Sequence, residues 1–315
     1  MTADAPACPC CGAALSLPRA GFRRDCARCG FACAALPVAI VDAAPALREH
    51  DRAAGLAPLR AANFARVLDR LDACGARPGG TMLEVGCAHG WFLEAAQRRG
   101  YTVLGIEPDA AIGAMAEARG LDVRKGFFPD ALARERRFDV IVFNDVFEHL
   151  PDPRAAMAAA AGALAPDGLL AINLPSNLGA LYRVAAALRV LGWRGPHDRM
   201  WQVGFPSPHL SYFNPDALAR LAAATGLREV DRQVLPSLAR AGLWRRIRYD
   251  AGASWLASAA TWCAVGMALP LLRWLPADIG LQVFARASQR SVADAPPVGA
   301  GGGPAGGAAT TSAIR

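Results

Sequence analysis

Residues 81–109, TMLEVGCAHGWFLEAAQRRGYTVLGIEPD, constrain the fold more than any other part of the chain. An apolar run suited to a buried parallel strand leads into a turn of small residues, a stretch with helical spacing and a second apolar run that ends in an acid. This order predicts half of a nucleotide-binding unit, in which backbone N–H groups of the turn can approach a ligand closely. The predicted parts are the strand 81–85, the turn 86–90, the helix 91–99, the strand 101–106 and the acid Glu107.

Two acids indicate what kind of ligand the turn accepts. Glu107 follows Gly86 by about 20 residues, the spacing at which an acid accepts hydrogen bonds from ribose hydroxyls. A dinucleotide fingerprint needs a third glycine, whereas this chain reads E-x-G-x-x-x-G with Glu84 inside the first strand. A carboxylate there repels a pyrophosphate and suits a cation. The sequence therefore predicts a cationic, adenosine-containing ligand and argues against a dehydrogenase.

These motifs resemble motifs I and II of the class I S-adenosylmethionine-dependent methyltransferases. The resemblance continues in order through FDVIVFNDVFEHLPDP (138–153), GLLAINLPSN (168–177) and HLSYFNPDALARLAAATGL (209–227), and covers roughly 60–235. The 138–153 segment is similar to that of ubiquinone-type O-methyltransferases. The resemblance implies an α/β fold, a Rossmann-like doubly wound sheet of seven strands. Ala88 departs from the family, which often has glycine there; a methyl group is tolerated at negative φ.

The resemblance also implies which residues bind S-adenosylmethionine, because ligands of such sheets lie beyond the carboxyl ends of the strands. The methionine side of the cofactor is expected beside the first strand and its turn, the ribose at the acid of the second strand, the adenine after the third strand and the amino-acid end after the fourth. For Asp145 a helix cap is the alternative role. The expected residues are Glu84, Gly86, Ala88 and Gly90, then Glu107, then Phe127, then Asn144 and Asp145.

Two histidines are candidates for the catalytic base. Histidine titrates near neutrality, and transfer to a hydroxyl requires removal of a proton. His149 is the first candidate, with a role in bracing its loop as the alternative, and His209 is the second. By resemblance to the ubiquinone-type enzymes, Asp145, Glu148 and His149 could hold a divalent ion. The insertion 175–213 is expected to form the acceptor wall, and plain core packing is the alternative for its ring side chains, Tyr182, Trp193, His197, Trp201 and Tyr212.

Six of the nine cysteines lie in residues 8–33. CPCCG and CARCG are two C-x-x-C-G knuckles, which predict a zinc ribbon in a reducing compartment. The expected ligands are Cys8, Cys11, Cys26 and Cys29; Cys10 and Cys33 are spares that could compete with them. A closed four-thiolate site would be structural. The alternative is reduced cysteines without a metal.

The chain divides into a zinc ribbon (1–35), a linker (36–58), a methyltransferase domain (59–290) and a Gly-, Ala- and Pro-rich tail (291–315) expected to be disordered. Strands and helices alternate in the domain, and its last strand is expected to insert antiparallel. The predicted helices are 59–75, 90–99, 109–119, 129–136, 153–165 and 215–225. The predicted strands are 81–85, 102–107, 121–124, 138–143, 168–173, 227–234 and 279–286.

Residues 240–275 form an apolar helical insertion. Its part 251–272 has no charged side chain and follows a basic, aromatic run at 244–249. A single membrane crossing would separate the last strand from its sheet, so two interpretations remain: a helix packed over the domain, which we favour, or a helix in the membrane interface. The second predicts peripheral membrane contact through 244–275. No signal segment opens the sequence, which predicts a cytoplasmic protein, membrane-associated on the second interpretation.

The sequence thus predicts a methyltransferase acting on a small-molecule or a lipid- or sugar-linked acceptor, with O-transfer favoured over C- or N-transfer. An rRNA or tRNA base methyltransferase whose ribbon contacts RNA is one alternative. Against it, the net charge of +7 rests on arginine with the single lysine Lys125, and no N-P-P-Y motif follows the fourth strand, so nucleic acid is not an expected partner. A non-catalytic cofactor- or partner-binding module is the other alternative. The oligomeric state is left open.

Overall fold

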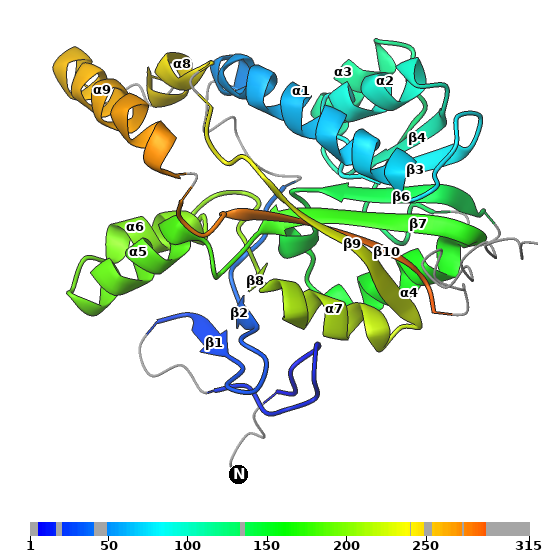
Figure 1. Ribbon diagram of the computed structural model, residues 1–315, viewed down its shortest axis with the longest axis horizontal. Helices are drawn as coiled ribbons and strands as arrows, with labels where there is room; N and C mark the ends of the chain where they lie inside the picture. The colour runs from blue at the N-terminus through cyan, green and yellow to red at the C-terminus, as the bar shows by residue number, and fades with distance from the viewer. Residues whose placement is uncertain are drawn as a thin grey trace, which may run out of the picture.

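The computed structural model describes residues 6–16, 21–40, 49–132, 136–239, 241–248, 254–272 and 274–287. A seven-stranded sheet with helices on both faces forms its centre, and a small N-terminal unit lies below it in Figure 1. This architecture confirms the predicted fold class. The strands of the sheet are β3 (Thr81–Val85), β4 (Thr102–Glu107), β5 (Val123–Lys125), β6 (Phe138–Asn144), β7 (Leu164–Pro175), β9 (Leu227–Leu235) and β10 (Ile279–Arg286).

The strand order is β5-β4-β3-β6-β7-β10-β9. The strands from β3 to β7 pair in parallel, and β10 pairs antiparallel with both β7 and β9, as expected for the last strand. From β3 the chain adds β4 and β5 on one side, then returns to add β6 and β7 on the other. The order therefore reverses between β3 and β6, and in such sheets the crevice beyond the carboxyl ends at this point binds the ligand.

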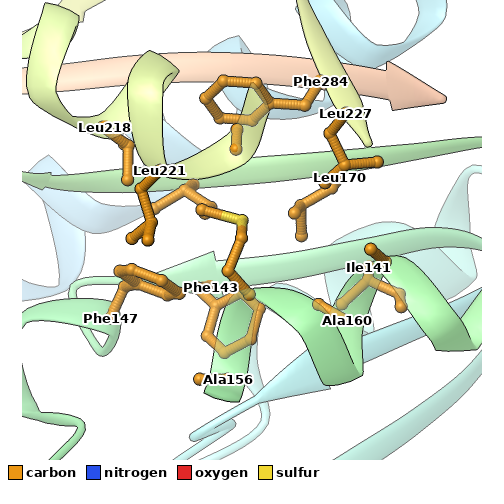
Figure 2. Packing of buried hydrophobic residues seen from close by; sticks show 14 of the residues in the cluster. Ile141, Phe143, Phe147, Ala156, Ala160, Leu170, Leu218, Leu221, Leu227 and Phe284 are labelled. Carbon is orange, nitrogen blue, oxygen red and sulfur yellow. The ribbon is translucent and has the colours of Figure 1, made fainter. Parts of the chain in front are cut away.

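Each face of the sheet carries its own apolar core. On one face, α1 (Glu49–Ala73), α2 (Trp91–Arg98) and α3 (Ala110–Glu117) cover the sheet with buried side chains such as Leu68, Phe92 and Ala116. On the other, α4 (Pro153–Ala163) and α7 (Pro215–Ala223) do so. Figure 2 shows the second core, where Phe143 and Leu170 of the sheet meet Leu221 of α7.

The predicted linker and one predicted helix differ from the structure. Helix α1 begins at Glu49 and includes Pro58, so the last ten residues of the predicted linker are helical; residues 41–48 lie outside the described residues. The predicted helix 129–136 is wrong where it is described. Residues 128–131 form turns closed by the bonds Ala131 N–H to Phe127 O and Leu132 N–H to Pro129 O, both 2.9 Å. Phe128 precedes a proline, which disfavours the helical conformation.

The N-terminal unit shares a second sheet with the large domain. Its strands β1 (Arg23–Asp25) and β2 (Ala32–Ala34) pair with β8 (Ser211–Tyr212), in the order β1-β2-β8. Phe31, 1% exposed, packs on Phe213 with ring centroids 5.0 Å apart, and the unit belongs to the same apolar cluster as α4 and α7. The small unit is thus built into the core of the fold.

The insertion 175–213 contains α5 (Ala180–Val190) and α6 (Arg194–Met200). Tyr182, Trp201 and Tyr212 pack on one another and on Ala32 as a buried cluster, and Trp193 is 68% exposed. Tyr182, Trp201 and Tyr212 thus take part in a core, the alternative role of these aromatic side chains, and an acceptor wall formed by 175–213 stays a prediction.

The apolar insertion 240–275 contains α8 (Leu243–Arg248) and α9 (Trp255–Leu272), which extend from the edge of the molecule beside α1 in Figure 1. Trp255, Leu256 and Met267 are 63, 75 and 73% exposed. The favoured prediction of a helix packed over the domain is wrong for these side chains. Among the described helices, none combines the length and the apolar character that a membrane crossing requires. The predicted tail, 291–315, lies outside the described residues.

Candidate functional site

The turn after β3 requires glycine at both ends. Gly86 and Gly90 have φ of 70° and 76°, which L side chains rarely adopt. A Cβ atom on Gly86 would lie 2.5 Å from Val146 Cγ2, and one on Gly90 would lie 2.3 Å from Leu121 Cδ1. The two glycines thus let the turn pass between neighbouring elements and keep its backbone close to the crevice.

Four N–H groups of this turn, those of Gly86, Cys87, Ala88 and Gly90, donate to acceptors inside the protein. Gly86 and Cys87 both donate to Ile106 O, at 2.7 and 3.1 Å, and Gly90 donates to Cys87 O at 2.8 Å. Ala88 donates to Glu107 Oε2 at 2.9 Å and has a φ of 45°, where the sequence analysis requires a negative value. The expected approach of backbone amides to a ligand is therefore not the role of these groups: the turn shapes space for a ligand and is held by β4.

Glu107 links the turn to the next helix. Its two oxygens accept from Ala88 N–H at 2.9 Å and from Asp109 N–H at 3.0 Å. The side chain is 7% exposed, and burial raises its pKa, against the lowering by these two bonds. Each oxygen retains a second lone pair, so the fixed carboxylate can still accept a hydrogen bond from a hydroxyl group.

Glu84 heads a row of polar side chains across three strand ends. Glu84 Oε1 accepts from Asn144 Nδ2 at 2.8 Å, and Asn144 Oδ1 accepts from Asn173 Nδ2 at 2.6 Å. Asn173 Oδ1 in turn accepts from Asp145 N–H at 3.2 Å. Sequence reasoning missed Asn173, because only the pairing of β6 with β7 places it opposite Asn144.

Glu84 has the properties of a cation-binding acid. It is 2% exposed, and burial raises its pKa to about 8. Its Oε2 atom is buried with no hydrogen-bond partner among the described residues. A buried carboxylate oxygen without a partner is costly, and a bound cation would remove that cost. The residues around the turn thus fit a nucleoside that carries a positive charge.

Phe127 and Asp145, the predicted cofactor residues that follow β5 and β6, differ in backbone conformation and exposure. Asp145 has a φ of 53°, and such strained non-glycine residues concentrate at functional sites. Phe127 is 48% exposed, while its neighbour Phe128 is buried against Phe143. Phe127 is therefore accessible for stacking.

The two candidate bases meet with ring centroids 4.8 Å apart. His149 Nδ1 lies 2.8 Å from the carbonyl oxygen of Pro208, which can only accept, so Nδ1 carries the proton and Nε2 the lone pair. Ser207 Oγ also contacts this Nδ1 atom, at 3.2 Å. The side chain of His149 is 18% exposed, so Nε2 belongs to a partly accessible ring.

His209 is deeper and more constrained. Tyr212 OH donates to Met200 O at 2.7 Å, so the phenol accepts from His209 Nδ1–H, 3.0 Å away. His209 Nε2 then accepts from the Gln202 amide at 2.8 Å. Burial lowers the pKa of His209 to about 3, which keeps the ring neutral. No sequence motif marks Gln202 and Tyr212 as the hydrogen-bond partners of His209.

Glu148 lies beside both rings. It is 1% exposed, its Oε1 atom is 3.9 Å from Nε2 of each histidine, and burial with the charge of Asp145 raises its pKa well above the usual range. The ligand atoms of Glu148, His149 and His209 all lie within 4.8 Å of one another. The three residues that could hold a metal are therefore Glu148, His149 and His209, and His209 takes the place of Asp145 in the predicted set.

The four predicted thiolate ligands of the N-terminal unit converge. The sulfur atoms of Cys8, Cys11, Cys26 and Cys29 lie within 4.8 Å of one another, with Cys8–Cys29 at 3.5 Å and Cys11–Cys26 at 3.4 Å. Sulfurs around a tetrahedral zinc ion are about 3.8 Å apart, from a Zn–S distance near 2.3 Å. The four residues could therefore hold one zinc ion; Cys10 and Cys33 are not in the group.

The fold and this site define a class of protein. The strand order with an antiparallel β10, the glycine turn after β3 and the acids at β3 and β4 are those of a Rossmann-like methyltransferase sheet. The chain belongs to this family: a family model described as a methyltransferase domain matches residues 55–231, more than half of the chain.

Curated relatives are named ubiquinone biosynthesis O-methyltransferase. The protein from Idiomarina loihiensis is 30% identical over 164 residues, 48% of this chain and 63% of that protein. The protein from Methylobacterium sp. is 30% identical over 190 residues, 56% of this chain and 72% of that protein. The protein from Hahella chejuensis is 34% identical over 153 residues, which are 45% of this chain and 63% of that protein. The chain thus spans just under two thirds of the first and third of these relatives.

Proposed function

We propose that this protein transfers a methyl group from S-adenosylmethionine to a hydroxyl group of a small-molecule acceptor. The observation that carries the proposal is Glu84, a buried acid at the point where the strand order reverses, with one oxygen that has no hydrogen-bond partner among the residues described. A cationic sulfonium nucleoside would favour the ionised form of this acid, and that negative charge would repel a pyrophosphate. The family and the names of the relatives agree with this assignment.

In this proposal each strand end holds one part of the cofactor. Glu84, Asn144 and Asp145 face its methionine part, and Gly86, Ala88 and Gly90 give it room. Glu107, already fixed by two backbone bonds, accepts from the ribose hydroxyls. Phe127, half-exposed after β5, stacks on the adenine.

His149 is the proposed base. The cofactor supplies a methyl carbon activated by an adjacent sulfonium. Nε2 of His149, which carries the lone pair, takes the hydroxyl proton as the acceptor oxygen forms its bond to the methyl carbon. S-adenosylmethionine, when bound, would supply the methyl group and leave with the electron pair of the carbon–sulfur bond as a neutral thioether. His209 is not the proposed base, because its own Nε2 lone pair already accepts a hydrogen bond from the Gln202 amide.

A divalent ion is a second way to activate the hydroxyl. Glu148, His149 and His209 would supply one carboxylate and two imidazole nitrogens, a set that suits Zn²⁺ or Fe²⁺, once His209 Nε2 gives up its hydrogen bond from Gln202. An ion there would lower the pKa of a bound hydroxyl. Titration of chelator-treated protein with Co²⁺ tests this site. A d–d absorption band that is lost in His209→Ala supports it, and identical Co²⁺ spectra of the unaltered protein and the variant would assign all binding to the cysteines.

The acceptor class follows from the relatives and from the surface. Ubiquinone biosynthesis, the process in the names of the relatives, suggests a phenolic acceptor. The exposed apolar side chains of α9 suit an acceptor with a lipid tail, and Trp244 of α8 lies beside them, with its ring centroid 6.4 Å from that of Trp255. Peripheral contact with a membrane through 244–275 is part of this proposal.

The two alternative functions predict other behaviour. An RNA methyltransferase would bind RNA with a steep dependence on salt concentration, and no relative reported above is named for RNA. A non-catalytic module with a vestigial pocket would show no rise in melting temperature with S-adenosylmethionine. We favour the enzyme because the glycines and acids of the cofactor site are all present.

Calorimetry with S-adenosylmethionine tests the cofactor assignment. We expect Glu107→Ala to weaken binding by more than about tenfold, because the ribose loses its acceptor and Ala88 N–H its partner. Glu117→Ala is the matched control, since this acid pairs with Lys125 on the surface. Binding of NADH with no binding of S-adenosylmethionine would refute the proposal.

Transfer of labelled methyl groups tests the reaction. A screen of catechols with and without a polyprenyl tail, of sugars and of lipids should give product with the catechols. His149→Ala should then lower kcat by about a hundredfold or more, the usual contribution of a general base, with the affinity for S-adenosylmethionine unchanged. Retention of kcat in this variant would exclude His149 as the base.

A further inference from the structure

The N-terminal unit reaches the site through the segment that carries His209. Strand β2 pairs antiparallel with β8, so that Ala32 lies opposite Tyr212 and Cys33 opposite Ser211. The N–H group of Ala34 donates to Leu210 O at 2.9 Å, one residue after His209. Among the described strands β8 has a single neighbour, β2, so the small unit supplies its sheet partner.

The same segment is held from the other side by the helical turn η1 (Phe147–His149). Leu210 N–H donates to Glu148 O at 2.8 Å, and Pro208 O accepts from His149 Nδ1 at 2.8 Å. The segment 205–214 therefore lies between β2 and the residues of the proposed base. His209 meets His149 because both sides of this segment are fixed.

The two cysteine loops are themselves attached to the large domain. Asn177 Nδ2 donates to Gly30 O at 2.6 Å, and Asn214 Nδ2 donates to Cys29 O at 2.7 Å. The guanidinium of Arg154 donates to Pro9 O at 2.6 and 3.0 Å. These carbonyl groups belong to the C-x-x-C loops, whose conformation a bound metal would fix.

The cofactor turn is stabilised by different contacts. Gly86, Cys87 and Ala88 donate to β4, through Ile106 O and Glu107 Oε2. These bonds lie within the unit 81–109 and involve neither β2 nor β8. The two halves of the site thus rest on separate supports.

We propose that the metal site of the N-terminal unit organises the acceptor half of the active site. Metal bound by Cys8, Cys11, Cys26 and Cys29 fixes β2, β2 fixes β8, and β8 holds His209 against His149, while the S-adenosylmethionine half forms without it. His209 is then a positioning residue. Ala34 connects β2 to the segment of His209 through its hydrogen bond to Leu210 O. The division into two halves rests on the proposed function.

Hydrogen exchange and chemical labelling of the full-length protein test this coupling. We compare zinc-loaded protein, chelator-stripped protein and stripped protein with zinc restored. Removal of zinc should raise amide exchange in 205–214 by at least about fivefold, the protection that one hydrogen bond gives, and should speed diethyl pyrocarbonate labelling of His209. Exchange in 81–107 and the Kd for S-adenosylmethionine should change by less than about twofold, and restored zinc should reverse the effects.

A variant with zinc still bound separates coupling from general unfolding. Ala34→Pro removes the N–H group that bonds Leu210 O and should reproduce the loosening of 205–214; Ala34→Gly keeps the donor and should not. Unchanged exchange in 205–214 for Ala34→Pro would overturn the coupling whatever the stripped protein shows, because zinc removal could also act at Glu148, His149 and His209. Unchanged exchange in stripped protein, or equal loosening of 81–107, would overturn it too. Absence of S-adenosylmethionine binding in every sample would instead overturn the proposed function, because the exchange results do not depend on it.

Discussion

At the scale of single residues, burial and hydrogen bonding fix what each polar group of the site can do. The two candidate histidines differ in their tautomers: in His149 the proton is on Nδ1 and the lone pair on Nε2, and in His209 the Nε2 lone pair accepts from Gln202. Glu84 and Glu107 also differ: Glu107 has backbone partners for both oxygens, and within the described part of the chain one oxygen of Glu84 has none.

Glu84 gives a pH prediction. Its pKa is about 8 in the folded protein and near the usual 4.5 in the unfolded chain, so between these values the folded state holds a proton that the unfolded state has lost. The free energy of unfolding should therefore fall as pH rises from 5 to 8, by up to about 1.4 kcal/mol per pH unit from this group.

Urea unfolding at several pH values measures this effect. In Glu84→Gln the side chain is neutral at every pH, so the fall should be smaller than in the unaltered protein by the contribution of Glu84. Saturating S-adenosylmethionine should also reduce it, because a cation favours the ionised carboxylate. Identical pH dependence in the two proteins would show that Glu84 is not buried in its protonated form.

At the scale of elements, the turn after β3 depends on two separate properties of glycine. Gly90 has a positive φ and also lies against Leu121 and Ala116, where an added Cβ would stand 2.3 and 2.9 Å from side-chain carbons. Gly120 has a similar φ of 79° but nothing within 4 Å of such a Cβ. The chain therefore offers its own control for separating backbone strain from crowding.

We expect Gly120→Ala to lower the free energy of unfolding by about 1 kcal/mol, the strain of the left-handed conformation. Gly90→Ala should lower it by about 2–4 kcal/mol, because crowding is added to the strain. Chemical denaturation of the two variants measures the difference. Equal losses would mean that Leu121 and Ala116 move aside without cost.

At the scale of the whole molecule, function depends on parts that lie far apart in the sequence. The ribbon, the insertion 175–213 and the strand ends of the sheet meet around His209, and α9 stands at one edge with much of its apolar surface exposed. An exposed apolar helix beside basic and aromatic side chains is typical of attachment to a membrane surface.

Vesicle co-sedimentation tests that attachment. We expect binding to phosphatidylcholine vesicles that contain phosphatidylglycerol, and a loss of about tenfold or more in the double variant Trp255→Ser, Leu256→Ser, because each side chain buries apolar area in the interface. Met115→Ser is the matched control: Met115 is 52% exposed, on α3. Equal binding by all three proteins, or none, would refute the membrane proposal.

The sequence by itself determined the sheet, the cofactor turn and the cysteine group, because these depend on local patterns: apolar runs, two glycines at a fixed spacing, an acid at a strand end and paired C-x-x-C knuckles. Only the tertiary structure decided that His209 meets His149, that Asn173 joins Glu84 through Asn144, and that β2 pairs with β8. Each of these contacts joins residues remote in the chain, and packing and strand register bring them together. The exposure of α9 was decided in the same way, since an apolar composition is compatible with both a core and a surface.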